Sequence, residues 1–355
     1  MSYTTLDATD FVVSSDSITA PAWSSNQPTL STFATASGPT TNVLSPEAFY
    51  LNVYQTASTA VGAAVQFSIA YGHSQGSGSP YYNQLVPGNT PSKTTYGQYK
   101  TLVYGTAIQS NEGFNFGAGN SNAAEIWAIN VERNRYKESL FPQTFNLGLK
   151  TAGGSEVKLT NNSNATSVLS FLDCGRVFDV VSGSNGTPTT ATLPGSPSTT
   201  PGYTPSGSYG LFLPDIGTII LNPAALKLDP TRGGIGLTTT TTANLPGLTS
   251  SINNTLLYQA VSRSANFQLN SQETVSSNYI FVRIRNTDYN YSTNPTFISG
   301  SGDLVFSTLI NNPQTYLTTI GLYNTNNELL AVGKMSRPLV KDFTKEALVR
   351  VKLDW

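Results

Sequence analysis

Charge is the first thing that this sequence has little of. Asp, Glu, Lys and Arg make up 11% of its 355 residues, against about 25% in an average soluble protein. With 19 basic and 20 acidic side chains the net charge is −1, which excludes a strongly basic nucleic-acid-binding protein as the default interpretation. Because net charge keeps a monomer dispersed, we expect much of this surface to be buried against partners.

Cysteine and histidine are almost absent. The single cysteine, Cys174, has no partner for an internal disulfide, and with the single histidine, His73, it is too little for a Cys/His zinc site. A catalytic triad would have to use His73, which lies in the Gly- and Ser-rich stretch 71–79 and is typical of a solvated loop. The glycines of 232–237 lack the Lys-Ser/Thr of a phosphate-binding loop. We therefore expect no metal, no cofactor and no enzymatic activity.

Long apolar runs are missing as well. No stretch reaches 18 apolar residues, so we expect no membrane insertion. Residues 1–11 have neither a basic start nor an apolar run, and we expect no secretory signal there.

What is present is typical of a mainly β protein. The chain has 18 Tyr and 16 Phe, which favour pleated, half-buried surfaces. Asn324-Thr325-Asn326-Asn327 predicts a hairpin turn, because Asn tolerates positive φ. Alternation or continuous apolar character predicts strands in 63–71, 126–131, 145–150, 210–222, 279–285, 316–322, 329–335 and 347–355. We predict antiparallel sheets in a sandwich-like arrangement, with a few short helices, long loops and an extended N-terminal arm.

Two segments predict helices. Residues 92–104 can begin at an N-cap serine, Ser92. Residues 249–264 have a serine cap, and one face carries Ile252, Leu256, Leu257 and Val261.

Composition divides the chain into four parts. The first 92 residues contain no Lys or Arg, and 14–42 are mostly small and polar. The expected parts are an extended arm over 1–42, a β-rich domain over 43–182, a Pro/Thr/Gly-rich linker or long loop over 183–207, and a β-rich C-terminal domain over 208–355 with a helix near 250–263 and a terminal hairpin and strand.

Four charges gather in Arg133, Arg135, Lys137 and Glu138. One interpretation is a solvated turn with a local ion pair, and the other is a polar contact with a partner or with the chain's own loops. The sequence leaves both open.

Several blocks resemble a known family. They are 133–149 (RNRYKESLFPQTFNLGL), 208–223 (SYGLFLPDIGTIILNP), 267–297 (FQLNSQETVSSNYIFVRIRNTDYNYSTNPTF) and 313–355 (PQTYLTTIGLYNTNNELLAVGKMSRPLVKDFTKEALVRVKLDW). Together they resemble a structural protein of contractile-tailed, T4-like cyanophages. The resemblance implies a component of the virion, placed with the tail or baseplate and made in the host cytoplasm, and it supplies no catalytic residues.

Three hypotheses for the function follow. The first is a non-enzymatic baseplate subunit that connects other virion proteins and copies of itself through the extended arm, the long loops and the terminal strand. The alternative is a receptor- or glycan-binding fibre or decoration protein in which tyrosine-rich loops contact the host surface. A polysaccharide hydrolase using Asp215 or Asp288 is the third and least favoured. The predicted interface residues are Phe11, Trp23, Phe33, Arg133, Arg135, Tyr289, Tyr291, Phe343 and Trp355.

Overall fold

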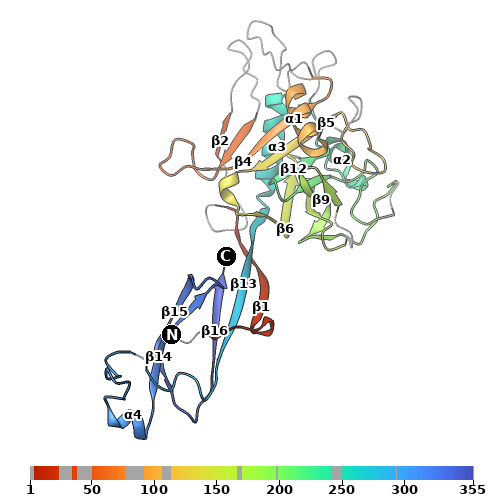
Figure 1. Ribbon diagram of the computed structural model, residues 1–355. Helices are drawn as coiled ribbons and strands as arrows, with labels where there is room; N and C mark the ends of the chain where they lie inside the picture. Colours follow the sequence, from red (N-terminus) through yellow and green to blue (C-terminus); the bar gives the residue numbers. More distant parts are fainter. Residues whose placement is uncertain are drawn as a thin grey trace. The chain divides into compact units, whose positions relative to one another are not determined.

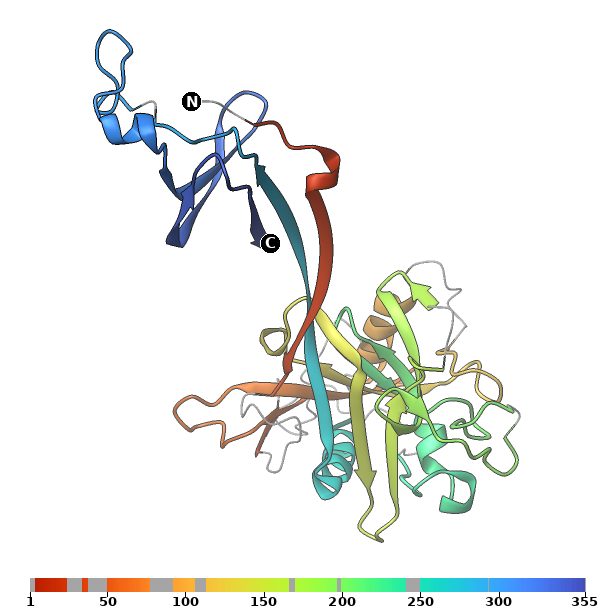
Figure 2. The ribbon, with the colours of Figure 1, turned by 90° about the horizontal axis from the view of Figure 1, so that it is seen from below.

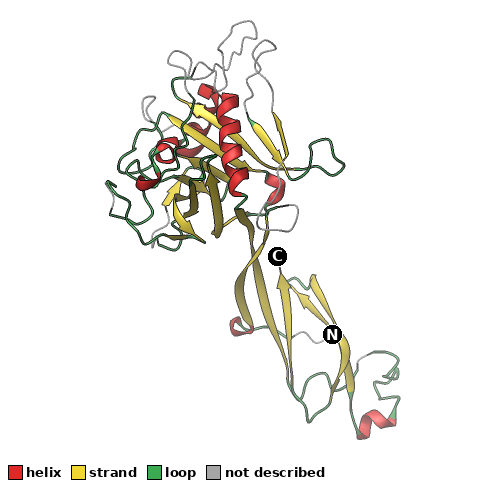
Figure 3. Cartoon of the chain, turned by 180° about the vertical axis from the view of Figure 1, so that it is seen from behind, coloured by secondary structure: helices red, strands yellow, loops and turns green. Residues whose placement is uncertain are grey.

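The computed structural model describes residues 4–23, 34–37, 50–76, 92–105, 113–165, 170–196, 199–240, 250–292 and 294–354 (Figure 1). It confirms the predicted class, because the chain is mainly β with a large antiparallel sheet, few helices and long loops (Figure 3). The strands are β1 (Phe11–Pro21), β2 (Ala34–Ser37), β3 (Leu51–Tyr54), β4 (Val65–His73), β5 (Glu125–Val131), β6 (Ser139–Lys150), β7 (Glu156–Asn161), β8 (Ser170–Leu172), β9 (Gly175–Ser184), β10 (Thr187–Pro188), β11 (Gly210–Leu213), β12 (Thr218–Leu221), β13 (Phe267–Ile284), β14 (Thr315–Tyr323), β15 (Leu329–Lys341) and β16 (Ala347–Asp354). The α-helices are α1 (Ser92–Tyr104), α2 (Pro223–Lys227), α3 (Ser250–Ser264) and α4 (Ser307–Asn311), with 3-10 turns at Ala8–Asp10, Arg133–Arg135 and Pro230–Arg232.

The chain forms two compact units. The central unit is Ile18–Glu273, and the terminal unit combines Met1–Ser17 with Thr274–Trp355. β13 belongs to both, because its first residues pair with β6 and its residues from Ser277 onward pair with β16. This division differs from the four expected parts.

The segment 183–207 is not a linker between domains. It connects β9 to β11, which are antiparallel neighbours in one sheet with Phe212 opposite Phe178. Within it, β10 folds back on β9 with Thr187 opposite Ser184. The Pro- and Thr-rich composition therefore reflects a long surface loop, the other interpretation that the sequence left open.

The central sheet curls around one core. Its strands follow the order β1-β13-β6-β7-β9-β11-β12-β5-β4-β3-β2, which places β13 and β4 far apart in the sheet. Yet the rings of Phe267 on β13 and Phe67 on β4 lie 5.1 Å apart. Trp23 contacts both, with ring centroids 4.8 Å from Phe267 and 5.8 Å from Phe67. The two arms of the sheet thus face each other across the core, which is a sandwich-like arrangement.

Helices cover the central sheet on both faces. α3 contacts β3, β4 and β6 (Figure 2). Its Leu257, Ala260 and Val261 join the main core. α1 contacts β4 and β5, and its Tyr96 and Val103 form a second core with Ile126 and Ala128. Burial on both faces explains the continuous apolar runs 126–129 in β5 and 219–221 in β12, all of whose side chains are buried.

β4 shows how tightly α1 packs. Alternation predicts one buried and one polar face for this strand, but Gln66 and Ala70 are buried as well as Phe67 and Ile69. A Cβ on Gly72 would lie 2.8 Å from the backbone nitrogen of Tyr96 in α1. Only glycine allows the helix to approach this closely.

The expected N-terminal arm is partly a strand of the fold. Residues 11–21 form β1, which pairs with β13. Trp23 is buried, and its indole nitrogen donates a 2.7 Å hydrogen bond to the carbonyl of Phe267. Residues 24–33 and 38–49 lie outside the described residues.

We predict that Trp23→Ala lowers the free energy of unfolding by about 3–5 kcal/mol, because it leaves a cavity where the two arms of the sheet meet. Urea unfolding measures this free energy. It is followed by far-ultraviolet circular dichroism, a signal that does not depend on the tryptophan being replaced. Phe171→Ala is the control, since that ring is 64% exposed. Equal stability of the two variants contradicts the prediction.

Candidate functional site: an exposed apolar surface on the terminal unit

The terminal unit is built from two antiparallel strand pairs. β13 pairs with β16, with Tyr279 opposite Lys352 and Ile280 opposite Val351. β14 pairs with β15 as the predicted hairpin. Its turn includes Asn327 at φ 60°, the left-handed conformation that asparagine tolerates.

These strands alternate in burial, but their inner positions are mostly only half-buried. In β16 the residues from Ala347 to Asp354 are alternately half-buried and exposed. β14 and the first part of β15 alternate in the same way. The alternation is the pattern of strands with one covered face, and here the cover is incomplete.

Apolar burial is distributed very unevenly between the units. Among the described residues, 47 hydrophobic side chains are buried, and Ile280 and Ile284 are the two that belong to the terminal unit. By contrast, 15 of the 20 large hydrophobic side chains that are exposed lie in the terminal unit. Full burial of one large apolar side chain contributes about 1.5–3 kcal/mol. In the isolated chain, the terminal unit therefore lacks most of the stabilisation that burial of its apolar side chains could provide.

A compact part of this surface lies on the outer face of the β14–β15 hairpin. Gly321 is opposite Val332, and Tyr323 is opposite Leu329. A Cβ on Gly321 would lie 2.9 Å from the Tyr323 ring and 3.2 Å from a methyl group of Leu329. Tyr323, Leu329 and Val332 are 38%, 53% and 58% exposed. We call these three residues the hairpin patch.

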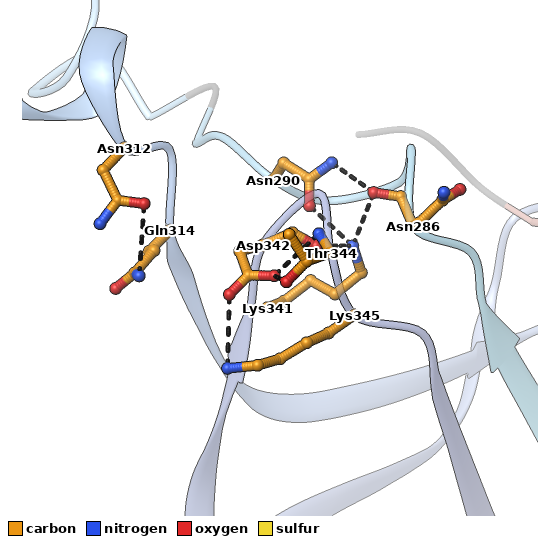
Figure 4. Close-up of polar contacts among 8 residues, drawn as sticks. All are labelled: Asn286, Asn290, Asn312, Gln314, Lys341, Asp342, Thr344 and Lys345. Atoms are coloured by element: carbon orange, nitrogen blue, oxygen red, sulfur yellow. Dashed lines mark hydrogen bonds and ion pairs between the residues drawn. The ribbon is translucent and has the colours of Figure 1, made fainter.

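A buried lysine organises a second part of the surface. Lys341 at the end of β15 is fully buried, and its ammonium group donates to the carbonyls of Asn286 and Asp342 (both 2.9 Å) and to Oδ1 of Asn290 (2.7 Å) (Figure 4). Asn290 is also fully buried, and its Nδ2 donates a 2.7 Å bond to the carbonyl of Asn286. Three oxygens thus replace the water that the charge loses on burial.

Lys341 brings three of the predicted interface residues into one region. The loop that it holds carries Tyr289 and Tyr291, and the turn that follows it carries Phe343. These side chains are 37%, 59% and 54% exposed. Tyr289 has φ 56°, and its carbonyl accepts a hydrogen bond from Thr315 on β14. The loop is therefore fixed at several points while its aromatic rings remain accessible.

No pattern in the sequence indicates the role of Lys341. Its surroundings, Pro338-Leu339-Val340-Lys341-Asp342, resemble the end of any exposed strand. Lysine is almost never fully buried. Its partners here are the carbonyl of the adjacent Asp342 and two oxygens, of Asn286 and Asn290, in a loop more than fifty residues earlier in the chain. Only the three-dimensional structure shows that Lys341 holds the loop around Asn286 and Asn290.

The remaining predicted interface residues fall in different environments. Phe11 begins β1 and is 46% exposed, whereas Trp23 is in the central core and is inaccessible to a partner. Phe33 and Trp355 lie outside the described residues. Arg133 and Arg135 form a 3-10 turn in which Arg133 donates a 2.7 Å hydrogen bond to the carbonyl of Tyr136 and lies over its ring. The structure thus gives Arg133 a contact with its own chain.

His73 has a local structural role. It lies at the end of β4, and its Nδ1 accepts a 3.0 Å hydrogen bond from the backbone of Gln75. Burial lowers its pKa, against the opposing charge of Glu125. That carboxylate accepts hydrogen bonds from the hydroxyls of Tyr71 (2.9 Å) and Thr239 (2.8 Å). These contacts tie β4, β5 and the segment before α3 together.

The two carboxylates considered for hydrolysis are also in structural roles. Asp215 binds the guanidinium of Arg176 through two nitrogens, at 2.6 and 3.0 Å, and accepts a 2.8 Å bond from its backbone nitrogen. Burial raises the pKa of Asp215, but these hydrogen bonds from Arg176 outweigh it and hold the pKa below its usual range. Asp288 accepts a 3.3 Å bond from the Arg285 backbone in an exposed turn.

A small polar hollow in the central unit is lined by side chains that hydrogen-bond to one another. It has a volume of about 170 Å³ and is lined by Asn146, Asn185, Gln268 and Lys158, among others. Asn146 and Asn185 bond each other through side chain and backbone, at 2.6 and 2.8 Å. The amides therefore fasten a turn to β6, and Lys158 is the one charged residue of the lining.

Within the described part of the chain, no cluster of three or more His, Cys, Asp or Glu side chains is arranged to hold a metal ion. The described helices include none that is long and apolar enough to cross a membrane. Comparisons with known protein families, with curated proteins and with solved structures found no match to this chain.

We predict that Lys341→Met releases the loop 285–292, because three oxygens lose their donor in a buried site at a cost of about 1–3 kcal/mol. Hydrogen exchange followed by mass spectrometry should show at least tenfold faster exchange for that loop. Lys345→Met is the matched control, since the Lys345 side chain is 55% exposed. Unchanged exchange in Lys341→Met contradicts the role assigned to the ammonium group.

Asp215→Asn should lower the free energy of unfolding by about 1–2 kcal/mol at pH 7, because it removes a charge-assisted pair. A carboxyl whose pKa is lowered by folding stabilises the folded state above its unfolded pKa of about 3.9, and this contribution disappears as pH falls through the folded value. The difference from wild type should therefore shrink below pH 4. Urea titrations at pH 7 and pH 3 test this, with Asp173→Asn as control, and a difference that does not depend on pH contradicts it.

Proposed function

We propose that this chain is a non-enzymatic structural subunit of a bacteriophage virion, in the tail baseplate. It connects neighbouring subunits through the terminal unit and through long loops. Its partners are other virion proteins and copies of itself, and nucleic acid and membranes take no part.

The observation that carries the proposal is the apolar surface of the terminal unit. Of the 20 exposed large hydrophobic side chains described, 15 lie there, against two buried ones. Large exposed apolar patches mark interaction sites, and aromatic residues such as Tyr323 and Tyr291 supply contact area at a small entropic cost.

Two further features support an assembled state. The net charge of −1 opposes close packing of subunits only weakly. The blocks that resemble the cyanophage structural protein include residues 313–355, which form the hairpin patch, the Lys341 centre and β16.

Substitution on the surface is a cleaner test than truncation. Removing residues 1–42 would delete β1 and take Trp23 out of the central core. Replacing the hairpin patch leaves the core intact, because its three side chains are exposed.

We predict that Tyr323→Ser/Leu329→Ser/Val332→Ser reduces incorporation into particles at least tenfold when the variant gene replaces the wild type in an infecting phage. Quantitative mass spectrometry of purified particles measures the copy number. Phe171→Ser, on an exposed ring of the central unit, should incorporate normally. Absence of the wild-type protein from purified particles would refute the proposed function.

One observation favours the alternative of a glycan-binding protein. Tyr289 and Tyr291 are accessible on a loop that is fixed by Lys341, and accessible aromatic rings on a rigid loop can stack on sugars. A glycan array with wild type and Tyr291→Ala tests it. The alternative requires hits that are lost in the variant, and an array without hits dismisses it.

A further inference from the structure

The terminal unit contains a three-stranded sheet with two open edges. β13 lies between β1 and β16, and each of these outer strands has β13 as its strand partner (Figure 1). Among the described residues no other strand pairs with the outer edge of β1 or of β16. β16 is eight residues long, and seven of the eleven residues of β1, 11–17, belong to the terminal unit. Exposed edges of this length offer rows of backbone donors and acceptors to another strand.

The two edges carry opposite charge. The segment 4–17, which contains the start of β1, has Asp7, Asp10 and Asp16 and no basic residue. β16 has Arg350 and Lys352 against Asp354, and all three are exposed. The charge on one edge strand is thus negative and that on the other is positive.

The two cations of β16 lie along one face of the sheet. Tyr279 on β13 is opposite Lys352, and both Arg350 and Lys352 lie over its ring, 5.5 and 5.8 Å from the centroid. A hydrogen bond with Asp354, together with the charges of Asp354 and Asp16, raises the pKa of Lys352. Tyr279, Arg350 and Lys352 therefore share one face of the sheet, and the negative charge of Asp16 on β1 acts on Lys352.

If both edge strands carried charge of the same sign, repulsion between like charges would oppose every pairing of copies at these edges. Here like charges oppose pairing of β1 with β1 and of β16 with β16. The same charges favour pairing of β1 with β16 of another molecule. Charge thus selects one of the three ways in which two copies can meet at these edges.

We propose that copies of this chain assemble head to tail, with the β1 edge of one copy pairing with the β16 edge of the next. The occupant of each edge is a second copy because this chain itself supplies a strand of complementary charge and sufficient length. Such a contact is heterologous, so it generates a ring or an open chain rather than a twofold dimer. The inference deepens the proposed function, on which it rests, by naming the partner at these edges.

The experiment uses two complementary charge variants of the full chain. The basic-edge variant is Ser14→Lys/Asp16→Lys, and the acidic-edge variant is Arg350→Glu/Lys352→Glu. In the first both edges are basic, and in the second both are acidic. Lys334→Glu/Arg337→Glu, two exposed residues of β15, changes charge by the same amount as the second variant and leaves β1 and β16 unaltered. Circular dichroism verifies that each variant is folded.

Sedimentation velocity of each protein at tens of micromolar and low salt gives the result. We expect wild type and the β15 control to form species larger than a dimer, each charge variant alone to be monomeric, and a one-to-one mixture of the two variants to form species larger than a dimer again. The mixture assembles again because it contains two complementary pairs of edges: the unchanged β1 and β16 edges pair as in wild type, and the two altered edges pair with their charges reversed. Wild-type association should weaken at least tenfold between 50 and 500 mM salt. This measurement uses wild type alone, so it tests the inference even if a variant fails to fold.

A monomeric wild type, salt-independent association, or charge variants that assemble like wild type would overturn the inference. These outcomes are distinguishable from failure of the proposed function. A wild type that is monomeric in solution but present in purified particles refutes the edge pairing alone. A wild type that assembles as expected but is absent from particles refutes the virion role alone.

Discussion

Apolar burial is concentrated in the central unit, and this constraint governs how the rest of the chain can behave. The central unit closes its sheet around Trp23, Phe67 and Phe267 and covers it with α1 and α3. Among the described residues of the terminal unit, two apolar side chains are buried, Ile280 and Ile284. Ordering each residue costs about 1–2 kcal/mol in backbone entropy, so strands with so little buried surface gain the most from covering by a partner.

The terminal unit compensates partly with polar interactions. Lys341 holds a loop and a turn with three hydrogen bonds where an apolar cluster would usually be found. Polar bonds of this kind fix geometry while leaving Tyr289, Tyr291 and Phe343 accessible. A rigid, exposed aromatic surface binds a partner with a smaller loss of entropy than a flexible one.

Local patterns in the sequence were sufficient to predict the two longest helices and the places of β4, β5, β14, β15 and β16. They did not predict β1, β7 or β9, and the single strand predicted over 210–222 is two antiparallel strands, β11 and β12. The α1 range of 92–104 agrees with the prediction, and the expected hairpin has its positive φ at Asn327. In α3 the predicted face is buried at Leu257 and Val261, while Ile252 at the start of the helix is exposed. These features depend on periodicity and turn chemistry over a few residues, which a sequence shows directly.

What the sequence could not show depends on contacts between distant segments. The residues around Trp23 have the composition of an extended arm, yet Trp23 packs against Phe267, 244 positions later in the chain. The second buried face of β4 exists because α1 packs on Gly72, and alternation within the strand contains no trace of that helix. The candidate surface was predicted only in part, since Tyr289, Tyr291 and Phe343 were named but the lysine that unites them was not.

The most direct measurement is hydroxyl-radical footprinting of the aromatic side chains, in the isolated chain and in purified particles. Coverage of the terminal unit by partners predicts strong protection of Tyr316, Tyr323, Tyr291 and Phe343 in the particle, with Phe171 of the central unit as an internal reference in both states. Equal labelling of those four side chains in the two states would contradict the idea that this surface exists to be covered.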